Sequence, residues 1–87
     1  MFLISNYDIL GILYDMEHMN RIKDILDEKG IKQTWLAQKL GKSYNMINSY
    51  VKNRRQPSIE DLYKIAKILD VEAKDLLLDL KGENSGK

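Results

Sequence analysis

Apolar residues recur at intervals of three and four positions along almost all of this sequence, as Leu62, Ile65 and Leu69 do. Such spacing places side chains on one face of an α-helix, whereas a half-buried β-strand needs apolar residues at every second position. The chain shows no internal repeat and no linker rich in proline or glycine. The pattern therefore predicts an all-α fold.

Length and composition limit this fold to one domain. With 87 residues, of which 44% are apolar and 31% charged, the chain can form one compact core but not two. It has no cysteine, which excludes a disulfide framework, a thiolate metal site and a catalytic thiol, and which suits a cytoplasmic protein. We expect an N-terminal extension over residues 1–18, the domain over residues 19–80, and a flexible polar tail over residues 81–87.

Five helices are expected within the domain, and most have a start or stop signal. Asn20, Ser43 and Ser58 are residue types preferred at the N-cap of a helix, and Gly30, Gly41 and Asn53 suit the residue that ends one. The expected helices run from Asn20 to Gly30, from Gln33 to Leu40, from Ser43 to Lys52, from Ser58 to Leu69, and from Ala73 to Leu80. Their apolar faces predict a core made of Ile22, Ile25, Leu26, Ile31, Leu36, Ala37, Leu40, Ile47, Tyr50, Val51, Ile59, Leu62, Ile65, Ala66, Leu69, Leu76, Leu77 and Leu80. Leu78 falls off this face, and an exposed leucine there would be a candidate dimer contact.

The charges nearly cancel over the whole chain, to a formal net charge of +1, but they are segregated along it. Between Lys29 and Ile59 there are seven basic residues and no acidic one, whereas acidic residues outnumber basic ones on both sides of this basic stretch. A local positive field of this kind is typical of a face that binds a polyanion. A solvated surface that happens to be basic would have the same composition.

The segment from Gln33 to Lys52 meets the physical requirements of a helix-turn-helix. Ala37 lets two helices cross closely, and Gly41 takes a turn that a side chain would obstruct. Ile47 and Val51 can anchor the second helix against the first, which leaves its opposite arc free to enter a major groove. That arc is polar and consists of Tyr44, Asn45, Asn48, Ser49 and Lys52.

The stretch from Asn20 to Leu77 resembles the Cro and phage-repressor type of helix-turn-helix, also called the xenobiotic response element family. The resemblance rests on residues in register with the family pattern: Gln33, Leu36, Ala37, Gly41, Ser43, Ile47, Pro57, Ser58, Leu62, Ile65 and Ala66. It implies a compact five-helix lambda-repressor-like domain in a small transcriptional regulator of the repressor or controller type. It also implies that the protein binds a double-stranded DNA operator with two-fold symmetry as a homodimer.

The resemblance further implies roles for individual residues. The base-reading set is Ser43, Tyr44, Asn45 and Ser49, joined by Asn48 on the same arc. The set that contacts the DNA backbone is Gln33, Lys39, Lys42, Lys52, Arg54 and Arg55. Asparagine pairs bidentately with adenine, and the base-reading set has no arginine to grip guanine, so we expect A·T pairs under Asn45 or Asn48.

Three features depart from the family pattern. Trp35 stands where a polar residue is more frequent, and it would pack on the phosphate backbone, pack on the N-terminal extension, or be a partly buried surface aromatic. Asn53 replaces a more frequent glycine, and asparagine tolerates the left-handed conformation. Residues 1–18 precede the usual start of such domains. They are either an element that packs on the domain or extends a dimer interface, or the result of an upstream start codon chosen in error.

Other function classes find little support in the sequence. His18 is the only histidine, so a histidine metal site and a Ser-His-Asp triad lack their parts, and no cofactor loop is present. We therefore expect neither an enzyme nor a cofactor, and residues 1–16 are too short and too charged to span a membrane. The alternative to a DNA-binding regulator is an antitoxin or another helical interaction module, whose main partner would be a toxin or other protein.

Overall fold

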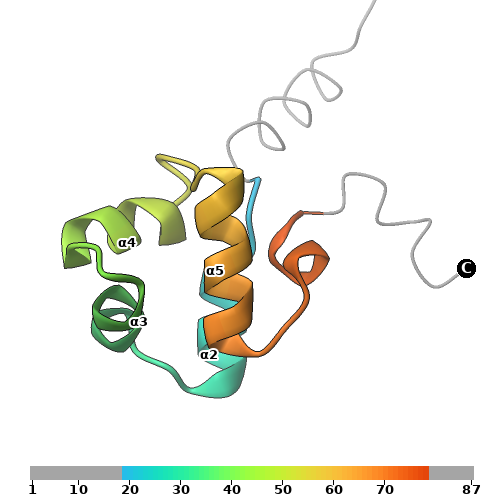
Figure 1. Ribbon diagram of the computed structural model, residues 1–87, viewed down its shortest axis with the longest axis horizontal. Coiled ribbons are helices and arrows are strands. Elements are labelled where there is room, and N and C mark those ends of the chain that lie inside the picture. Colours follow the sequence, from blue (N-terminus) through green and yellow to red (C-terminus); the bar gives the residue numbers. More distant parts are fainter. Residues whose placement is uncertain (1–18, 79–87) are drawn as a thin grey trace, which may run out of the picture.

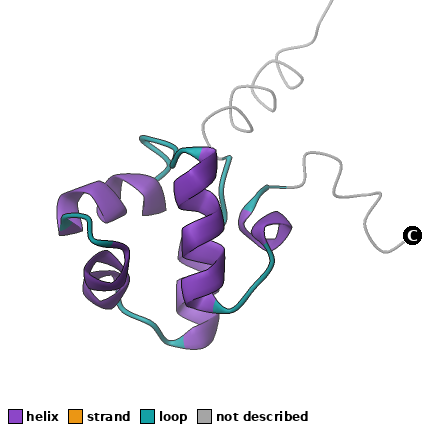
Figure 2. Ribbon diagram, viewed as in Figure 1, coloured by secondary structure: helices purple, strands orange, loops and turns teal. Residues whose placement is uncertain are grey.

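The computed structural model describes residues 19–78, so the expected extension over residues 1–18 and the tail over residues 81–87 lie outside it. The described chain forms four α-helices and one short 3-10 helix (Figure 1). These are α2 (Ile22–Lys29), α3 (Gln33–Leu40), α4 (Tyr44–Val51), α5 (Ile59–Leu69) and η1 (Ala73–Leu76). Helices and loops account for the part of the chain described in Figure 2, which confirms the predicted all-α class.

The caps predicted at Ser43, Ser58, Gly30 and Gly41 form where the sequence placed them. The Ser43 Oγ accepts a hydrogen bond from the Met46 N–H at 3.1 Å, and the Ser58 Oγ accepts one from the Asp61 N–H at 3.0 Å. At the other ends, Gly30 closes α2 with φ 66° and Gly41 closes α3 with φ 77°. Local chemistry therefore fixes both the helix lengths and the tight connections between them.

The start of α2 differs from the prediction by one residue. Arg21, not Asn20, occupies the N-cap position, and its side chain makes no capping hydrogen bond. Asn20 still serves this helix end, because its Oδ1 accepts the Ile22 N–H at 3.0 Å. The chemical role is the predicted one, performed from one position further out.

The core lies between α5 and the helices around it. In Figure 1, α3 and α4 lie on one side of α5 and η1 on the other, with α2 behind α5. The buried apolar residues are Ile22, Ile25, Leu26, Leu36, Ala37, Ile47, Tyr50, Val51, Ile65, Ala66, Leu69 and Leu76. The predicted core residues Ile31, Leu40 and Leu62 are partly buried and pack against this cluster.

The prediction was wrong for Ile59, whose side chain is 73% exposed. Ile59 is the first residue of α5, and helical spacing puts it on the same face as Leu62 and Ala66. It lies one turn beyond the buried part of that face, beside an apolar groove instead of within the core. Periodicity predicts which face a residue lies on, but not whether another element reaches that end of the helix.

The prediction was also wrong for the fifth helix, which ends at Leu76 instead of Leu80. Leu77 is extended and forms an isolated antiparallel bridge with Asn20. The Leu76 carbonyl accepts the Arg21 N–H at 2.7 Å, and the Leu78 N–H donates to the Met19 carbonyl at 3.0 Å. These bonds use backbone groups that a continuing helix would need.

This bridge changes the burial of the two leucines that follow η1. Leu77, expected in the core, is 46% exposed, and Leu78, expected on the surface, is half-buried. Leu80 lies outside the described residues. Leu78 therefore does not offer the exposed dimer contact that its place in a regular helix had indicated.

Candidate nucleic-acid interface

The helices α3 and α4 form the predicted helix-turn-helix. Leu36 and Ile47 are fully buried between them, and Ala37 is 5% exposed. The Gly41 N–H donates to the Ala37 carbonyl at 2.9 Å and the Lys42 N–H to the same oxygen at 3.0 Å. Because these bonds close the turn tightly, α4 leaves α3 in a fixed direction.

The outer face of α4 carries the predicted base-reading side chains. Tyr44 is 47% exposed and Asn45 is also exposed, whereas Asn48 and Ser49 are half-buried. Ser43, at the N-cap, is exposed, but its Oγ is engaged with the Met46 N–H. The structure thus brings the five residues together on and beside one helix, and their contact with bases stays a prediction.

Ser49 differs from the other predicted readers because its hydroxyl is already used within the helix. Its Oγ donates to the Met46 carbonyl at 2.7 Å. The Arg55 guanidinium reaches toward the same turn, with Nη1 at 3.8 Å from the Met46 sulfur. Tyr44 and Asn45 therefore have the freest functional groups on this face, and Ser49 is restricted to accepting a further hydrogen bond.

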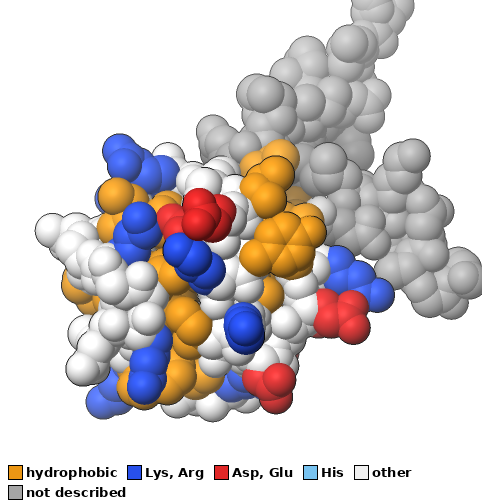
Figure 3. All heavy atoms as spheres, in the orientation of Figure 1, with side chains coloured by type: hydrophobic (Ala, Val, Ile, Leu, Met, Phe, Trp, Pro, Cys, Tyr) orange, Lys and Arg blue, Asp and Glu red, His pale blue; other side chains and the backbone are white. Residues whose placement is uncertain are grey.

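Lys and Arg side chains are distributed over the α3 and α4 side of the molecule in Figure 3. The ion pairs between Met19 and Leu78 involve Arg21, Lys23, Lys42, Lys64 and Lys74. Lys42 alone belongs to the basic stretch. The other cations of that stretch pair with no carboxylate of residues 19–78: Lys29, Lys32, Lys39, Lys52, Arg54 and Arg55. Their charge remains available to an external anion.

The acidic residues of α2, which are Asp24, Asp27 and Glu28, each form an ion pair with Arg21 or Lys23. On α2, the Lys23 ammonium donates to the Asp27 carboxylate at 2.8 Å. This hydrogen bond and the negative charge of Asp27 raise the pKa of Lys23 above its ordinary value. The carboxylates of α2 are thus partly neutralised by Lys23 of the same helix and by Arg21 at its N-cap.

Lys42, a predicted backbone contact, is held within the protein. Its Nζ lies 3.3 Å from the Asp61 carboxylate, and the two side chains are 37% and 15% exposed. This ion pair ties the helix-turn-helix turn to the first turn of α5. Its phosphate contact stays a prediction, but Lys42 would have to share its charge between Asp61 and the DNA.

The start of α3 is the one α-helix start in the described chain that no side chain caps. Asn20, Ser43 and Ser58 each accept a hydrogen bond at the start of α2, α4 and α5, whereas the N-cap residue of α3, Lys32, makes none. The first N–H groups of α3 are therefore available to an anion, with the positive end of the helix dipole behind them. Gln33, the predicted phosphate contact, is the first residue of this helix.

Gln33 is half-buried, and its Oε1 is buried without a hydrogen-bond partner in the described structure. It lines a shallow hollow of about 350 Å³ together with Lys32, Thr34 and Tyr44. Lys32 and Thr34 were not predicted as site residues, although their position beside Gln33 at a helix start could have identified them. The hollow joins the start of α3 to the first turn of α4.

Asn53, the residue after the C-cap of α4, has the left-handed conformation with φ 58°, as its resemblance to the family glycine position led us to expect. Its side chain also holds the surrounding backbone, which the sequence did not indicate. The Oδ1 accepts the N–H groups of Met19 at 2.8 Å and Asn20 at 2.9 Å, and it accepts the Gln56 amide at 3.0 Å. The Nδ2 donates to the Asn20 carbonyl at 3.1 Å.

Arg54 and Arg55 follow this asparagine, and both are exposed. Their N–H groups donate to the Ser49 carbonyl at 2.9 Å and 3.3 Å. The loop that carries the two arginines is therefore fixed to the last turn of α4 on one side and to Asn20 on the other. Lys52 is exposed at the C-cap of α4, so these three predicted backbone contacts lie together.

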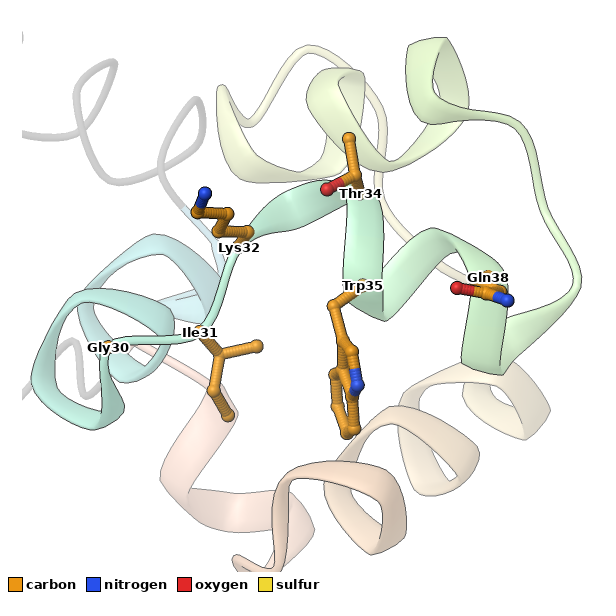
Figure 4. A pocket seen from close by; sticks show the side chains of 6 residues that line it. All are labelled: Gly30, Ile31, Lys32, Thr34, Trp35 and Gln38. Carbon is orange, nitrogen blue, oxygen red and sulfur yellow. The ribbon is translucent and has the colours of Figure 1, made fainter.

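Trp35 lies on another side of α3, beside a shallow pocket of about 550 Å³ (Figure 4). Ile31 and Trp35 contribute its large apolar side chains, and Gly30, Lys32, Thr34 and Gln38 complete its lining. The Lys39 ammonium lies 5.3 Å from the centroid of the Trp35 ring, within the range of a cation–π contact. Lys39, a predicted backbone contact, is thus placed beside the indole, and Trp35 is 41% exposed.

Residues 19–78 contain neither a candidate metal site nor a helix that could span a membrane. This part of the chain contains no group of three or more side chains that could hold a metal ion. Its helices are all too short or too polar to cross a lipid bilayer.

Comparisons with known proteins agree with this geometry. The family model described as Helix-turn-helix (HTH_3) matches residues 22–76, which is more than half of the chain. The crystal structure of a candidate DNA-binding protein from Bacteroides fragilis is 42% identical in sequence, with a TM-score of 0.68. That match covers 69% of this chain and 97% of the other. A search of curated proteins finds no significant match.

Proposed function

The chain belongs to the Helix-turn-helix family HTH_3, and from this premise we propose that it is a sequence-specific transcriptional regulator that binds double-stranded DNA through α4. The observation that carries the proposal is the position of an exposed polar helix face next to cations that have no carboxylate partner in residues 19–78. Tyr44 and Asn45 would reach base edges, and Lys52, Arg54 and Arg55 would contact phosphates. The similarity to a candidate DNA-binding protein supports the same partner.

The start of α3 would hold a second phosphate. Its uncapped N–H groups and the amide of Gln33 lie beside Lys32, and Asp27, the one carboxylate that lines this hollow, is paired with Lys23. This contact adjoins the first turn of α4, whereas Lys52, Arg54 and Arg55 follow its last turn, so the two contacts lie at opposite ends of α4. Together they would fix the register of α4 in the major groove, while the bases determine which sequence is preferred.

The test is a binding-site selection from random duplexes, followed by affinity measurements by fluorescence anisotropy over a range of salt concentrations. Replacing Arg54 and Arg55 together by alanine should reduce the salt slope by about two, since each phosphate contact contributes about 0.9. Affinity should fall by up to about thirtyfold for every duplex alike, because each exposed ion pair contributes up to about 1 kcal/mol.

The matched control replaces Lys64 and Lys67 by alanine, two exposed cations of α5 outside the basic stretch. It makes the same change in net charge and should leave the salt slope unchanged. Equal effects of the two double variants would mean that net charge, not a contact by Arg54 and Arg55, governs binding. The proposal fails altogether if the selection enriches no sequence and the parent protein binds no duplex.

Asn45→Ala tests the base-reading role separately. We expect it to weaken the selected site by about 1–3 kcal/mol, to relax preference at an A·T pair, and to leave non-specific binding unchanged. Half-sites composed only of G·C pairs would contradict the assignment of Asn45 and Asn48. We further propose a homodimer on two half-sites about one helical turn apart, and the DNA stoichiometry of the selected complex checks it.

A further inference from the structure

An apolar groove of about 480 Å³ runs beside α5 on the side of η1. Its larger apolar lining residues are Met19, Pro57, Ile59, Leu62, Tyr63 and Leu77. It therefore lies between the chain segment that enters the domain, the start of α5, and the segment that leaves η1. None of the residues proposed to contact DNA lines it.

The exposed apolar surface of the described domain is concentrated at this groove. Between Met19 and Leu78, six large apolar side chains are exposed. Two of them, Trp35 and Tyr44, belong to the helix-turn-helix. The other four surround the groove: Met19 at 41%, Ile59 at 73%, Tyr63 at 63% and Leu77 at 46% exposure. Figure 3 shows apolar side chains gathered over the N-terminal half of α5. A contiguous patch of this kind marks a contact surface.

We propose that residues 2–16 of the same molecule dock in this groove. The segment joins the domain at Met19, which itself lines the groove, so the occupant is attached to the rim of its site. Its apolar residues include Ile9, Ile12, Leu13 and Met16, at the spacing of one face of an α-helix. The polypeptide after the domain, residues 79–87, contains only Leu80 as a large apolar residue and is a poor match.

The point of attachment is rigid, which favours docking within one molecule. The Met19 N–H donates to the Asn53 Oδ1 at 2.8 Å, and the Met19 carbonyl accepts the Leu78 N–H at 3.0 Å. Only Glu17 and His18 separate the segment from Met19, so its end lies within two residues of the groove. A tethered segment has a high effective concentration at its site, so shallow contacts suffice to hold it.

Charge agrees with this choice of occupant. Residues 1–17 contain Asp8, Asp15 and Glu17 and no lysine or arginine. The groove is lined by Lys74, whose ammonium has only an exposed contact to Glu72 at 3.7 Å. An acidic amphipathic segment therefore meets one cation and no lining carboxylate at the groove.

Docking of residues 2–16 does not depend on whether the protein binds DNA. Hydrogen exchange of the full chain, followed by mass spectrometry, tests this docking. Amides of residues 9–16 should exchange at least about tenfold more slowly in the protein than in a peptide of residues 1–18, because docking protects them. Ile59→Lys should restore the peptide rate. Since Ile59 is 73% exposed, this substitution should leave the fold intact, which the exchange of core amides in α2 and α5 checks.

Trp35→Lys is the matched control, because Trp35 is an exposed apolar residue outside the groove. It should leave the protection of residues 9–16 unchanged. The proposal would be overturned by exchange in the parent at the peptide rate, by protection that Ile59→Lys does not alter, or by protection that Trp35→Lys removes. Protection that disappears on dilution would also overturn it, because the groove would then hold the segment of a second copy.

Discussion

Asn53→Gly is the most informative single substitution for this domain, because two explanations of Asn53 predict opposite results. If the residue is present only to adopt φ 58°, glycine should serve as well or better, since it carries no strain there. If its side chain holds the chain together, glycine should be destabilising. The structure favours the second explanation, because the side chain makes four hydrogen bonds to other residues.

The expected magnitude follows from where those bonds end. Two of the donors, the Met19 N–H and the Gln56 amide, belong to exposed residues, and water can replace Asn53 there. The Asn20 N–H and carbonyl belong to a residue that is 5% exposed. A buried backbone group left unpaired costs about 1–3 kcal/mol, and partial access of water should reduce the combined loss to about 2 kcal/mol. A domain of this size has a total stability of only about 3–9 kcal/mol.

The assay is urea unfolding followed by far-UV circular dichroism, with Trp35 fluorescence as a second probe. Asn53→Gly should lower the free energy of unfolding by about 2 kcal/mol without changing the slope against urea. Asn53→Ala should cost about 1 kcal/mol more, because it adds the strain of the left-handed conformation. A glycine variant as stable as the parent would refute the bridging role of the side chain and leave only the conformational one.

The remaining predictions concern the core, the caps and the ion pair. Ile47→Ala should destabilise the domain by about 2–5 kcal/mol in the same urea assay, because it leaves a cavity at a fully buried position. Ser43→Ala and Ser58→Ala should each cost about 1 kcal/mol, and an unchanged midpoint would show that the caps contribute nothing. Asp61→Asn should lower the free energy of unfolding by no more than about 1 kcal/mol. It should also tighten duplex binding because it frees Lys42, whereas Glu60→Gln, which makes the same change in charge, should leave duplex binding unchanged.

Sequence reasoning predicted the central part of the fold because there each signal was local. The caps at Ser43 and Ser58 and the left-handed glycines are determined by residues within one turn of them. It failed where a distant segment competes for backbone groups. The helix after Ala73 is cut short because the Leu76 carbonyl is taken by Arg21, a partner more than fifty residues away in sequence that no local pattern reveals.

In the candidate site, too, local features were predicted and contacts with distant segments were missed. Helical periodicity correctly placed Tyr44 and Asn45 on the exposed face of α4 and Ile47 on the buried one. It gave no sign that Lys42 would be paired with Asp61, because the two meet only when α5 packs against the turn. The side-chain role of Asn53 was missed for a similar reason, since its partners Met19 and Asn20 come from the start of the domain.

Asn53 connects the proposed DNA-binding face to Met19, one of the residues that line the apolar groove. On one side, its Oδ1 holds the N–H of Met19, the residue through which residues 1–18 join the domain. On the other, it is followed directly by Arg54 and Arg55, whose N–H groups share the Ser49 carbonyl. The hydrogen bond from the Met19 N–H to Asn53 thus connects the attachment point of the N-terminal segment to the loop that carries the two arginines. Any effect of the segment on DNA affinity should therefore depend on the Asn53 side chain, and Asn53→Gly should abolish it.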